Sequence, residues 1–268
     1  MNVIYSCIIA ISMYSKIPMP QVDWTPERMR HIMCFFPIVG LLEGLCLGGW
    51  FYIALEVMGF SVGMTSLVGA AVPVLVTGGI HLDGFLDTMD AIHSYGDRAK
   101  KLEILKDPHV GAFAVISAVA YALLYAGVLW EYVSMVAVRG REDMAAYVFP
   151  MWLFTMERAF SGLSVLTFPS AKKDGLAASF AQAAEKKKGS QVLILWLLVL
   201  AAAAFAFLKG KGAGLVCLTA AVQLAVFVYY RRMSDRDFGG ITGDLAGWFL
   251  QVCELASMGA AVVYLKMW

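Results

Sequence analysis

Residues 77–111 read T-G-G-I-H-L-D-G-F-L-D-T-M-D-A-I-H-S-Y-G-D-R-A-K-K-L-E-I-L-K-D-P-H-V-G and separate two long apolar stretches of the chain. Six of the chain's 20 acidic residues fall within 25 positions of this segment: Asp83, Asp87, Asp90, Asp97, Glu103 and Asp107. Carboxylates beside apolar spans are costly to desolvate. We therefore interpret the rest of the chain as a scaffold that holds this acidic segment at a membrane face.

The overall composition is typical of an integral membrane protein. Of the 268 residues, 60% are hydrophobic and 15% are charged, and the mean hydropathy is +0.71. A soluble domain carries about 25% charged residues, so we predict an all-α, polytopic bundle that forms one domain over residues 1–268. The net charge of +1 argues against nucleic acid as a partner. Five scattered cysteines without a C-x-x-C spacing argue against a disulfide framework.

Seven apolar stretches are long enough to cross a bilayer, which takes about 20 helical residues. We expect spans at residues 32–58, 62–81, 110–134, 144–168, 190–208, 212–230 and 245–266. Residues 1–14 are apolar but too short to cross, so an interfacial or re-entrant helix is expected there. Three prolines within residues 17–31 predict a loop or a broken segment.

The basic residues predict the orientation of the chain. If residue 20 lies in the cytoplasm, 15 of the 21 Lys and Arg residues fall on the cytoplasmic side, five fall on the other side and Arg158 lies within a span. By the positive-inside rule, residues 77–111, 169–190 and 231–244 are then cytoplasmic. This pattern suits a bacterial cytoplasmic (inner) membrane with the active site facing the cytoplasm. Residues 169–190, amphipathic with basic ends, suit a headgroup-binding helix, a lid or a topology signal.

Asp83, Asp87 and Asp90 have the spacing i, i+4, i+7, which places them within about 60° on one helix face. Three like charges repel one another, and a hard divalent cation such as Mg²⁺ is the usual remedy because it prefers oxygen ligands. The competing interpretation is a solvated acidic cap, neutralised by the basic residues that follow. Gly78, Gly79 and Gly84 favour the metal site, since a plain solvated face does not need such close backbone approach.

A second acidic pair, Glu103 and Asp107, is also spaced i, i+4. Asp107-Pro108 has the form of a helix N-cap followed by proline at the first helical position, opening the span that follows. Asp107 is then either only a cap or a further metal ligand from a facing helix.

Residues 231–244 read R-R-M-S-D-R-D-F-G-G-I-T-G-D and lead into a span. A glycine-rich turn at a helix N-terminus can present backbone N–H groups to a phosphate, and Arg236 adds charge that can meet a diphosphate. Asp244 is the expected N-cap. Within the spans, Glu43, Glu157, Arg158 and Glu254 need partners or water. Glu157 and Arg158 are adjacent, so each is expected to pair with another helix.

These residues together predict a membrane enzyme that uses a metal to act on a phosphoanhydride. Several blocks then resemble the cobalamin synthase family, the adenosylcobinamide-GDP ribazoletransferases, in the family's order and over nearly the whole chain. The central block is T-G-G-I-H-L-D-G-F-L-D-T-M-D-A, followed by L-E-I-L-K-D-P-H-V-G. The supporting blocks are Y-S-K-I-P-M-P at 14–20, F-P-I-V-G at 36–40, R-A-F-S at 158–161, and F-G-G-I-T-G-D-L-A-G at 238–247 with Glu254 beyond it.

The resemblance implies the last assembly step of vitamin B12 synthesis. The hydroxyl of α-ribazole, or of its 5′-phosphate, attacks the cobinamide-bound phosphate of adenosylcobinamide-GDP and displaces GMP. Members of the family are membrane proteins that need Mg²⁺. The metal ligands expected by position are Asp83, Asp87, Asp90 and Asp107, and the catalytic candidates are Asp107, His81 and Glu103. The expected substrate-binding residues are Gly239, Gly240, Thr242, Gly243, Asp244, Lys16, Arg158 and Arg236.

Two other functions stay open from the sequence. The Asp87-x-x-Asp90 and Glu103-x-x-x-Asp107 spacings are similar to the signature of CDP-alcohol phosphotransferases, which perform the same chemistry in phospholipid synthesis and would imply a two-metal site with one carboxylate as general base. A cation-coupled transporter would use the carboxylates for ions in transit, but its site belongs near the midplane on broken helices. The resemblance also leaves room for a homo-oligomer, or a complex with other corrinoid-assembly enzymes.

Overall fold

The computed structural model describes residues 2–140, 144–171, 184–207 and 211–267, and every regular element within them is a helix. The all-α bundle predicted from composition is therefore confirmed. The helices are α1 (Asn2–Tyr14), α2 (Pro26–Met29), α3 (Ile32–Tyr52), the π-helical turn η1 (Ile53–Val57), α4 (Val62–Thr77), α5 (Ile80–His93), α6 (Arg98–Ile104), α7 (Ala112–Arg139), α8 (Met144–Thr167), α10 (Lys186–Phe207), α11 (Lys211–Asp237) and α12 (Gly243–Met267).

By length and apolar composition alone, fewer of the described helices qualify as membrane spans than the seven expected. Among the described residues, five segments are long and apolar enough to cross a membrane: 32–57, 112–139, 186–204, 212–237 and 243–267. A sixth is obtained if α4 and α5, which meet at a 95° bend, form one broken span. The expected span at 144–168 does form a helix, α8, but Glu157 and Arg158 make it too polar to pass as a lipid-exposed crossing. Its residues are instead mostly buried inside the bundle.

Helix α8 packs against α3 through a row of glycines. Gly40, Gly44 and Gly48 recur every four residues along α3, and a Cβ atom at each would collide with the backbone of α8. Small residues at this spacing let two helix backbones approach closely, which is a common way of packing helices in membranes. This contact fixes α3 and α8 as the centre of the bundle.

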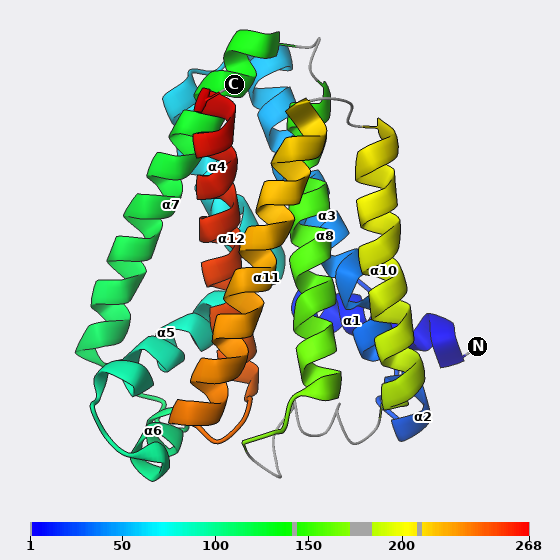
Figure 1. Cartoon of the computed structure of the whole chain (residues 1–268), viewed down its shortest axis with the longest axis vertical. Coiled ribbons are helices and arrows are strands. Elements are labelled where there is room, and N and C mark those ends of the chain that lie inside the picture. Colours follow the sequence, from blue (N-terminus) through cyan, green and yellow to red (C-terminus); the bar gives the residue numbers. More distant parts are fainter. Residues whose placement is uncertain (1, 141–143, 172–183, 208–210, 268) are drawn as a thin grey trace.

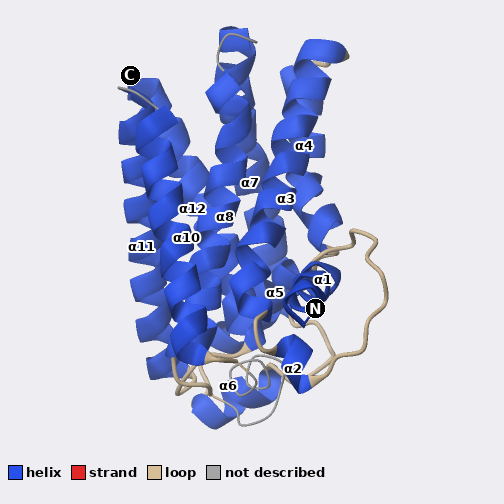
Figure 2. Cartoon of the chain, turned by 90° about the vertical axis from the view of Figure 1, so that its right-hand side faces the viewer, coloured by secondary structure: helices blue, strands red, loops and turns tan. Residues whose placement is uncertain are grey.

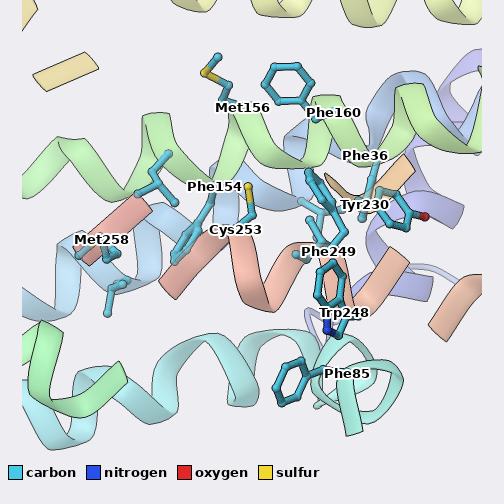
Figure 3. Packing of buried hydrophobic residues seen from close by; sticks show 14 of the residues in the cluster. Phe36, Phe85, Phe154, Met156, Phe160, Tyr230, Trp248, Phe249, Cys253 and Met258 are labelled. Atoms are coloured by element: carbon cyan, nitrogen blue, oxygen red, sulfur yellow. The ribbon is translucent and has the colours of Figure 1, made fainter. Parts of the chain in front are cut away.

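Aromatic side chains fill the space between the central helices and α11 and α12. The rings of Tyr230 and Phe249 stack with centroids 5.2 Å apart, and Phe227 lies 5.8 Å from Phe249. Figure 3 shows this cluster, with Phe85 of α5 at its edge on the side of Trp248. The core therefore extends from the central pair of helices to the helix that carries the acidic residues.

One end of the bundle gathers the polar connections. Helices α2 and α6, and the turn between α11 and α12, lie at the lower end in Figures 1 and 2, whereas the chain's C-terminus lies at the upper end. Helix α1, 13 residues long, packs low on the bundle near α2, in keeping with the short non-spanning helix expected there. Residues 77–111 and 231–244 thus reach the same end, as predicted. The expected headgroup-binding or lid segment at 169–190 lies mostly outside the described residues.

Candidate functional site

A sharp bend delivers the acidic helix to the lower end of the bundle. Helix α4 ends at Thr77, and the next two residues, Gly78 and Gly79, have φ angles of +67° and +80°. L-residues with side chains rarely adopt this left-handed conformation. The backbone N–H of Lys16 donates to the carbonyl of Val76 (2.7 Å), and the stem of the Lys16 side chain covers Gly78 so closely that a Cβ atom there would collide with it. Lys16 is therefore part of the bend.

Helix α5 bears the three aspartates on one face, as their spacing predicts. Asp83 is exposed, whereas Asp87 and Asp90 are half-buried. The carboxylate of Asp90 accepts hydrogen bonds from the backbone N–H groups of Gly111 (2.6 Å) and Ala114 (2.8 Å). These are free donors of the first turn of α7, so Asp90 caps the following long helix from outside.

This cap corrects the role predicted for Asp107. Helix α7 begins at Ala112, with Gly111 in the N-cap position, so Asp107 is too early in the chain to cap it. Its exposed carboxylate instead accepts from the backbone N–H of His109 (3.0 Å) and contacts the His109 ring (2.6 Å). The backbone hydrogen bond, with the ring contact second, lowers the pKa of Asp107 below its ordinary value. The local pattern gave the wrong cap because the residue that caps α7, Asp90, lies 21 residues before Gly111.

Helix α6 carries the other predicted acid and attaches to α11. Glu103 is exposed and pairs with Lys100 (3.0 Å). Arg98 donates to the backbone carbonyls of Asp235 (2.8 Å) and Arg236 (3.0 Å) at the C-terminal end of α11, where cations are favourable. A half-buried ion pair of 3.0 Å between Lys101 and Asp237 completes this attachment. The basic residues after the tri-aspartate face therefore do more than balance its charge, because they join the two predicted halves of the site.

The turn after α11 is the glycine-rich stretch expected to face phosphate. Gly239 and Gly240 have φ angles of +76° and +150°, and the N–H of Ile241 donates to the carbonyl of Pro169 (2.8 Å). Thr242 accepts from the N–H of Leu245 (3.2 Å) and is the N-cap of α12. The prediction that Asp244 is the cap is therefore wrong. A threonine two residues earlier has the better geometry because its short hydroxyl reaches back into the first turn.

Helices α5 and α12 cross at glycines. A Cβ atom at Gly84 of α5 would lie 2.8 Å from the backbone of Asp244, and one at Gly247 of α12 would lie 2.7 Å from the carbonyl of His81. Side chains larger than hydrogen are thus excluded from the crossing. As a result, the helix with Asp83 and Asp87 lies directly against the N-terminal turn of α12. Gly247 was not among the predicted site residues, since a single glycine within an apolar helix carries no local signal of what it touches.

His81, the second residue of α5, lies at this crossing. The side chain is 4% exposed, and its ring lies 5.9 Å from each of the rings of Tyr14 and Phe36. Among the described residues, its Nε2 atom has no hydrogen-bond partner. His81 is therefore held by aromatic packing at the base of the site, not displayed on its surface. Arg236, by contrast, is exposed and pairs with Asp237 (2.7 Å).

Arg158 lies in a buried ionic cluster inside the bundle. Its guanidinium, fully buried, donates to Glu43 of α3 (2.6 Å), to Glu254 of α12 (3.2 Å) and to its neighbour Glu157. The predicted pairing with other helices is confirmed for Arg158 but not for Glu157, whose carboxylate is paired with Arg158 of the same helix. The long side chain of Arg158 can reach back to its neighbour because it is not bound to the direction of its Cβ atom. The cluster binds three helices together, and its guanidinium is occupied by carboxylates.

The arrangement thus places the segment of α5 that bears Asp83 and Asp87 against the start of α12, where Thr242, Gly243 and Asp244 lie, with Lys16 at the bend before α5. Glu103 and Asp107 lie on the attached α6 segment, and Arg158 lies apart. Among the described residues, no three His, Cys, Asp or Glu side chains already surround one point as metal ligands would. The donors nevertheless fit Mg²⁺ in kind, since carboxylate oxygens on a polar end of the bundle are the ligands it takes.

The fold and the candidate site together define a class of protein. It is an all-helical membrane protein in which an acidic helix packs against the glycine-rich N-terminus of another helix at one end of the bundle. The model of the family described as cobalamin-5-phosphate synthase matches residues 6–262, so the chain belongs to that family. It is accordingly a transferase of cobalamin synthesis, as the sequence resemblance implied.

Named relatives agree with this assignment. The chain is 39% identical to the adenosylcobinamide-GDP ribazoletransferase of Lachnoclostridium phytofermentans over 95% of this chain and 92% of that protein. Proteins of the same name match at 29% identity from Clostridium botulinum, over 98% of this chain and 99% of that one, and at 32% from Pseudomonas fluorescens, over 87% and 88%. No solved structure matches the chain.

Proposed function

We propose that this protein transfers the adenosylcobinamide phosphate group from adenosylcobinamide-GDP to α-ribazole or its 5′-phosphate. The hydroxyl oxygen of the ribazole forms a bond to the phosphorus attached to cobinamide. The bond from that phosphorus to the bridging oxygen breaks, and GMP leaves with the oxygen. The products are adenosylcobalamin, or its 5′-phosphate, and GMP. The names of the relatives supply the substrates.

The observation that carries this proposal is the crossing of α5 and α12. It sets the segment of α5 that bears Asp83 and Asp87 against the first turn of α12, where Gly84 meets the backbone of Asp244. Backbone N–H groups at a helix N-terminus attract phosphate, while carboxylates attract the cation that accompanies a diphosphate. An acidic and a phosphate-binding element placed side by side suit phosphoryl transfer, which needs positioning and charge neutralisation more than covalent catalysis.

Asp83 and Asp87 would hold Mg²⁺, with Asp90 and Asp107 as further ligands. When bound, the ion would neutralise charge on the diphosphate and on the departing GMP. Both oxygens of Asp90 already accept hydrogen bonds from α7, so any ligand role of this residue is shared with capping. The lowered pKa of Asp107 keeps its carboxylate ionised, which suits a metal ligand better than a general base.

Four residues contribute to binding in this proposal without touching a metal. Lys16 at the bend and Arg236 at the end of α11 would attract the diphosphate, Arg as a planar fork and Lys as a point charge. Gly239 and Gly240 give the turn the left-handed backbone that brings Thr242 into position. We place this site at the cytoplasmic face of a bacterial inner membrane, because the basic residues favour that side.

The decisive experiment mixes the purified protein in phospholipid vesicles with adenosylcobinamide-GDP, α-ribazole and Mg²⁺, and measures GMP. We expect GMP in proportion to cobalamin product, loss of turnover with EDTA and recovery with added Mg²⁺. Turnover that persists in EDTA would refute the metal requirement alone. Absence of GMP together with turnover of a CDP-alcohol would refute the proposed reaction, and ion flux without either turnover would favour a transporter.

Orientation has its own test. Tyr95, in the loop between α5 and α6, is 89% exposed. A Tyr95→Cys variant whose five native cysteines are replaced should react with a membrane-impermeant maleimide in inverted membrane vesicles and not in intact cells. Labelling in intact cells would place the site on the outer side.

A further inference from the structure

An apolar groove lies behind the acidic helix. It has a volume of about 350 Å³ and is formed by α5, α7 and α12. Its lining includes Phe85 and Met89 of α5, Ala120, Tyr121 and Leu124 of α7, and Ala256 of α12. Figure 1 shows α7 leaning away from α12 toward its lower end, where α5 lies. The groove therefore has two long helices as walls and the acidic helix as its base.

The groove is continuous with the lipid-facing surface. Leu124 lines it and is 59% exposed, and Ile116 and Leu123 of the same helix are 61% and 70% exposed. Apolar residues on a candidate membrane span are left exposed because the hydrocarbon of the bilayer covers them. The opening of the groove thus faces lipid and not water.

Helix α5 presents opposite faces to the two sides. At 100° per residue, Phe85 and Met89 lie about 200° around the helix from Asp83 and Asp87 respectively. Such an amphipathic helix, bent 95° away from α4, resembles helices that lie in the membrane interface with their apolar face toward the acyl chains. On its apolar face, the Phe85 ring already packs on Tyr121, with ring centroids 5.3 Å apart, whereas Met89 is half-buried and borders the groove.

We propose that a phospholipid acyl chain occupies this groove and packs beneath Phe85 and Met89, so that bilayer lipid supports the helix bearing Asp83 and Asp87. A polar ligand fits poorly, because the hydroxyl of Tyr121 already donates to Glu254 (3.4 Å) and few other polar groups are available. A second copy of the chain would need a contact of about 1,200 Å² or more, much wider than this narrow groove. Occupancy by lipid stands on the groove alone. Its effect on turnover rests on the proposed function.

A second groove provides a matched control. It lies between α8 and α10, is also apolar, has a volume of about 310 Å³ and is lined in part by Ala145, Trp152 and Ala203. These residues belong to the beginning of α8 and the end of α10, which lie at the opposite end of the bundle from α5. The variant Ala203→Trp fills this groove, and Ala120→Trp fills the proposed lipid site.

The first measurement is photo-crosslinking in vesicles that contain a phosphatidylglycerol with a diazirine on one acyl chain. We expect labelled peptides from residues 117–124 and 252–256 at several times the level found on the exposed residues within 192–199 of α10, which lie away from the second groove. Ala120→Trp should abolish this excess, and Ala203→Trp should leave it intact. Equal labelling of α10 and the groove, or an excess that survives Ala120→Trp, would overturn the proposal. Crosslinks between two protein chains through these peptides would show that a second copy occupies the groove.

The second measurement does not depend on activity. Hydrogen exchange of the amides of residues 80–93 should slow when phosphatidylglycerol is added to the delipidated protein in detergent. In Ala120→Trp these amides should exchange slowly with or without lipid, because the indole replaces the chain. If added lipid does not change the exchange rates of these amides in the unmodified protein, the proposal that lipid supports α5 is refuted. If Ala120→Trp does not fold, Ala256→Leu fills the same groove with a smaller side chain and is judged in the same way. Failure of these tests leaves the GMP assay unaffected.

Discussion

Two groups of charged residues occupy very different surroundings in this molecule. The cluster around Arg158 is buried inside the bundle, and its carboxylates come from α3, α8 and α12. The carboxylates of α5 and α6 lie at the bundle's end, where Asp83, Glu103 and Asp107 are exposed. The chain thus places carboxylates both in the buried interior of the bundle and at its solvent-exposed end.

The contrast indicates which group is the better candidate for chemistry. A buried charge is tolerated only when its partners are in place, so the guanidinium of Arg158 is committed to holding helices together. The exposed carboxylates avoid most of the desolvation cost and can exchange water for a cation. A motif match alone does not distinguish Arg158 from Asp87. Their burial differs, and we therefore expect Arg158 to hold the helices together and Asp87, half-buried at the bundle's end, to act in the site.

The strongest test of this contrast is Arg158→Leu. It leaves the carboxylates of Glu43, Glu157 and Glu254 buried without a counter-charge, and breaking a buried ion pair costs about 3–5 kcal/mol. We expect loss of the folded, monodisperse protein, measured by fluorescence-detected size exclusion and thermal unfolding in detergent. Arg158→Lys, which keeps the charge but not the planar fork, should recover part of the stability. A well-folded but inactive Arg158→Leu protein would instead assign this residue to substrate.

Asp87→Asn should lower activity and leave the fold intact, the opposite of what is expected for Arg158→Leu. The side chain keeps its shape but loses its charge, so folding should persist while turnover falls by about 100-fold or more, the scale typical for loss of one electrostatic group from an active site. The assay is GMP release, with a Mg²⁺ titration to detect weaker metal dependence. Asp23→Asn is the control, since Asp23 is an exposed acid in the loop before α2, paired with Arg28. Equal activity of the two variants would remove Asp87 from the site.

Gly247→Ala tests the crossing that joins the two halves of the site. The added methyl would press on the carbonyl of His81 at 2.7 Å, and such overpacking costs about 1–3 kcal/mol. We expect a lower melting temperature and reduced turnover. Gly259→Ala on the same helix meets nothing within 4 Å and should be neutral or slightly stabilising. If both variants behaved alike, the crossing would not be a tight contact.

Asp90→Ala should lower the stability of the fold less than Gly247→Ala does, because it removes only a helix cap. The N–H groups of Gly111 and Ala114 lose their acceptor, at a cost of about 0.5–2 kcal/mol. Hydrogen exchange at the start of α7 should rise. Asp97→Ala removes the cap of the short α6, where Asp97 accepts from the N–H of Lys100 (2.9 Å), and should leave α7 unchanged. Unaltered exchange in α7 after Asp90→Ala would contradict the cap.

The smallest expected effect is the pH dependence of stability at the turn that contains Asp107. The pKa of Asp107 is lowered chiefly by the N–H of His109. A carboxyl whose pKa is lower in the folded state stabilises that state above its unfolded pKa, and the contribution disappears as pH falls through the folded pKa. Acid should therefore loosen the turn at residues 107–109, and Asp107→Asn should remove this acid dependence. Carboxyl titration by NMR in micelles would measure it, and a pKa at or above the ordinary value would contradict the turn.

Much of this architecture follows from local pattern. Apolar stretch length predicted the long helices to within a few residues, except α11, which runs seven residues past the expected end at 230. The i, i+4, i+7 spacing predicted the shared face of Asp83 and Asp87 because a helix has a fixed period. These features depend on residues that are neighbours along the chain.

The errors arose where the partner lies far along the chain. Asp107 and Asp244 each look like N-caps locally, but a carboxylate from another helix serves α7 and a threonine serves α12. The interior location of α8 likewise depends on the glycines of α3, which lie about a hundred residues earlier in the chain. The periodicity of a single sequence does not show which helix surfaces pack against one another.

The cap that Asp90 forms on α7 has a consequence for how this chain can vary. Because α5 bonds directly to Gly111 and Ala114, the ends of the excursion between residue 94 and residue 110 are already joined. Lengthening such a closed excursion costs little, about 0.6 kcal/mol for each doubling. Related chains should therefore tolerate a change of length between residue 94 and Asp97, ahead of α6, while the aspartate face stays in register. The frame of the site is the α5–α7 joint, and α6 is fastened to it through Arg98 and Lys101.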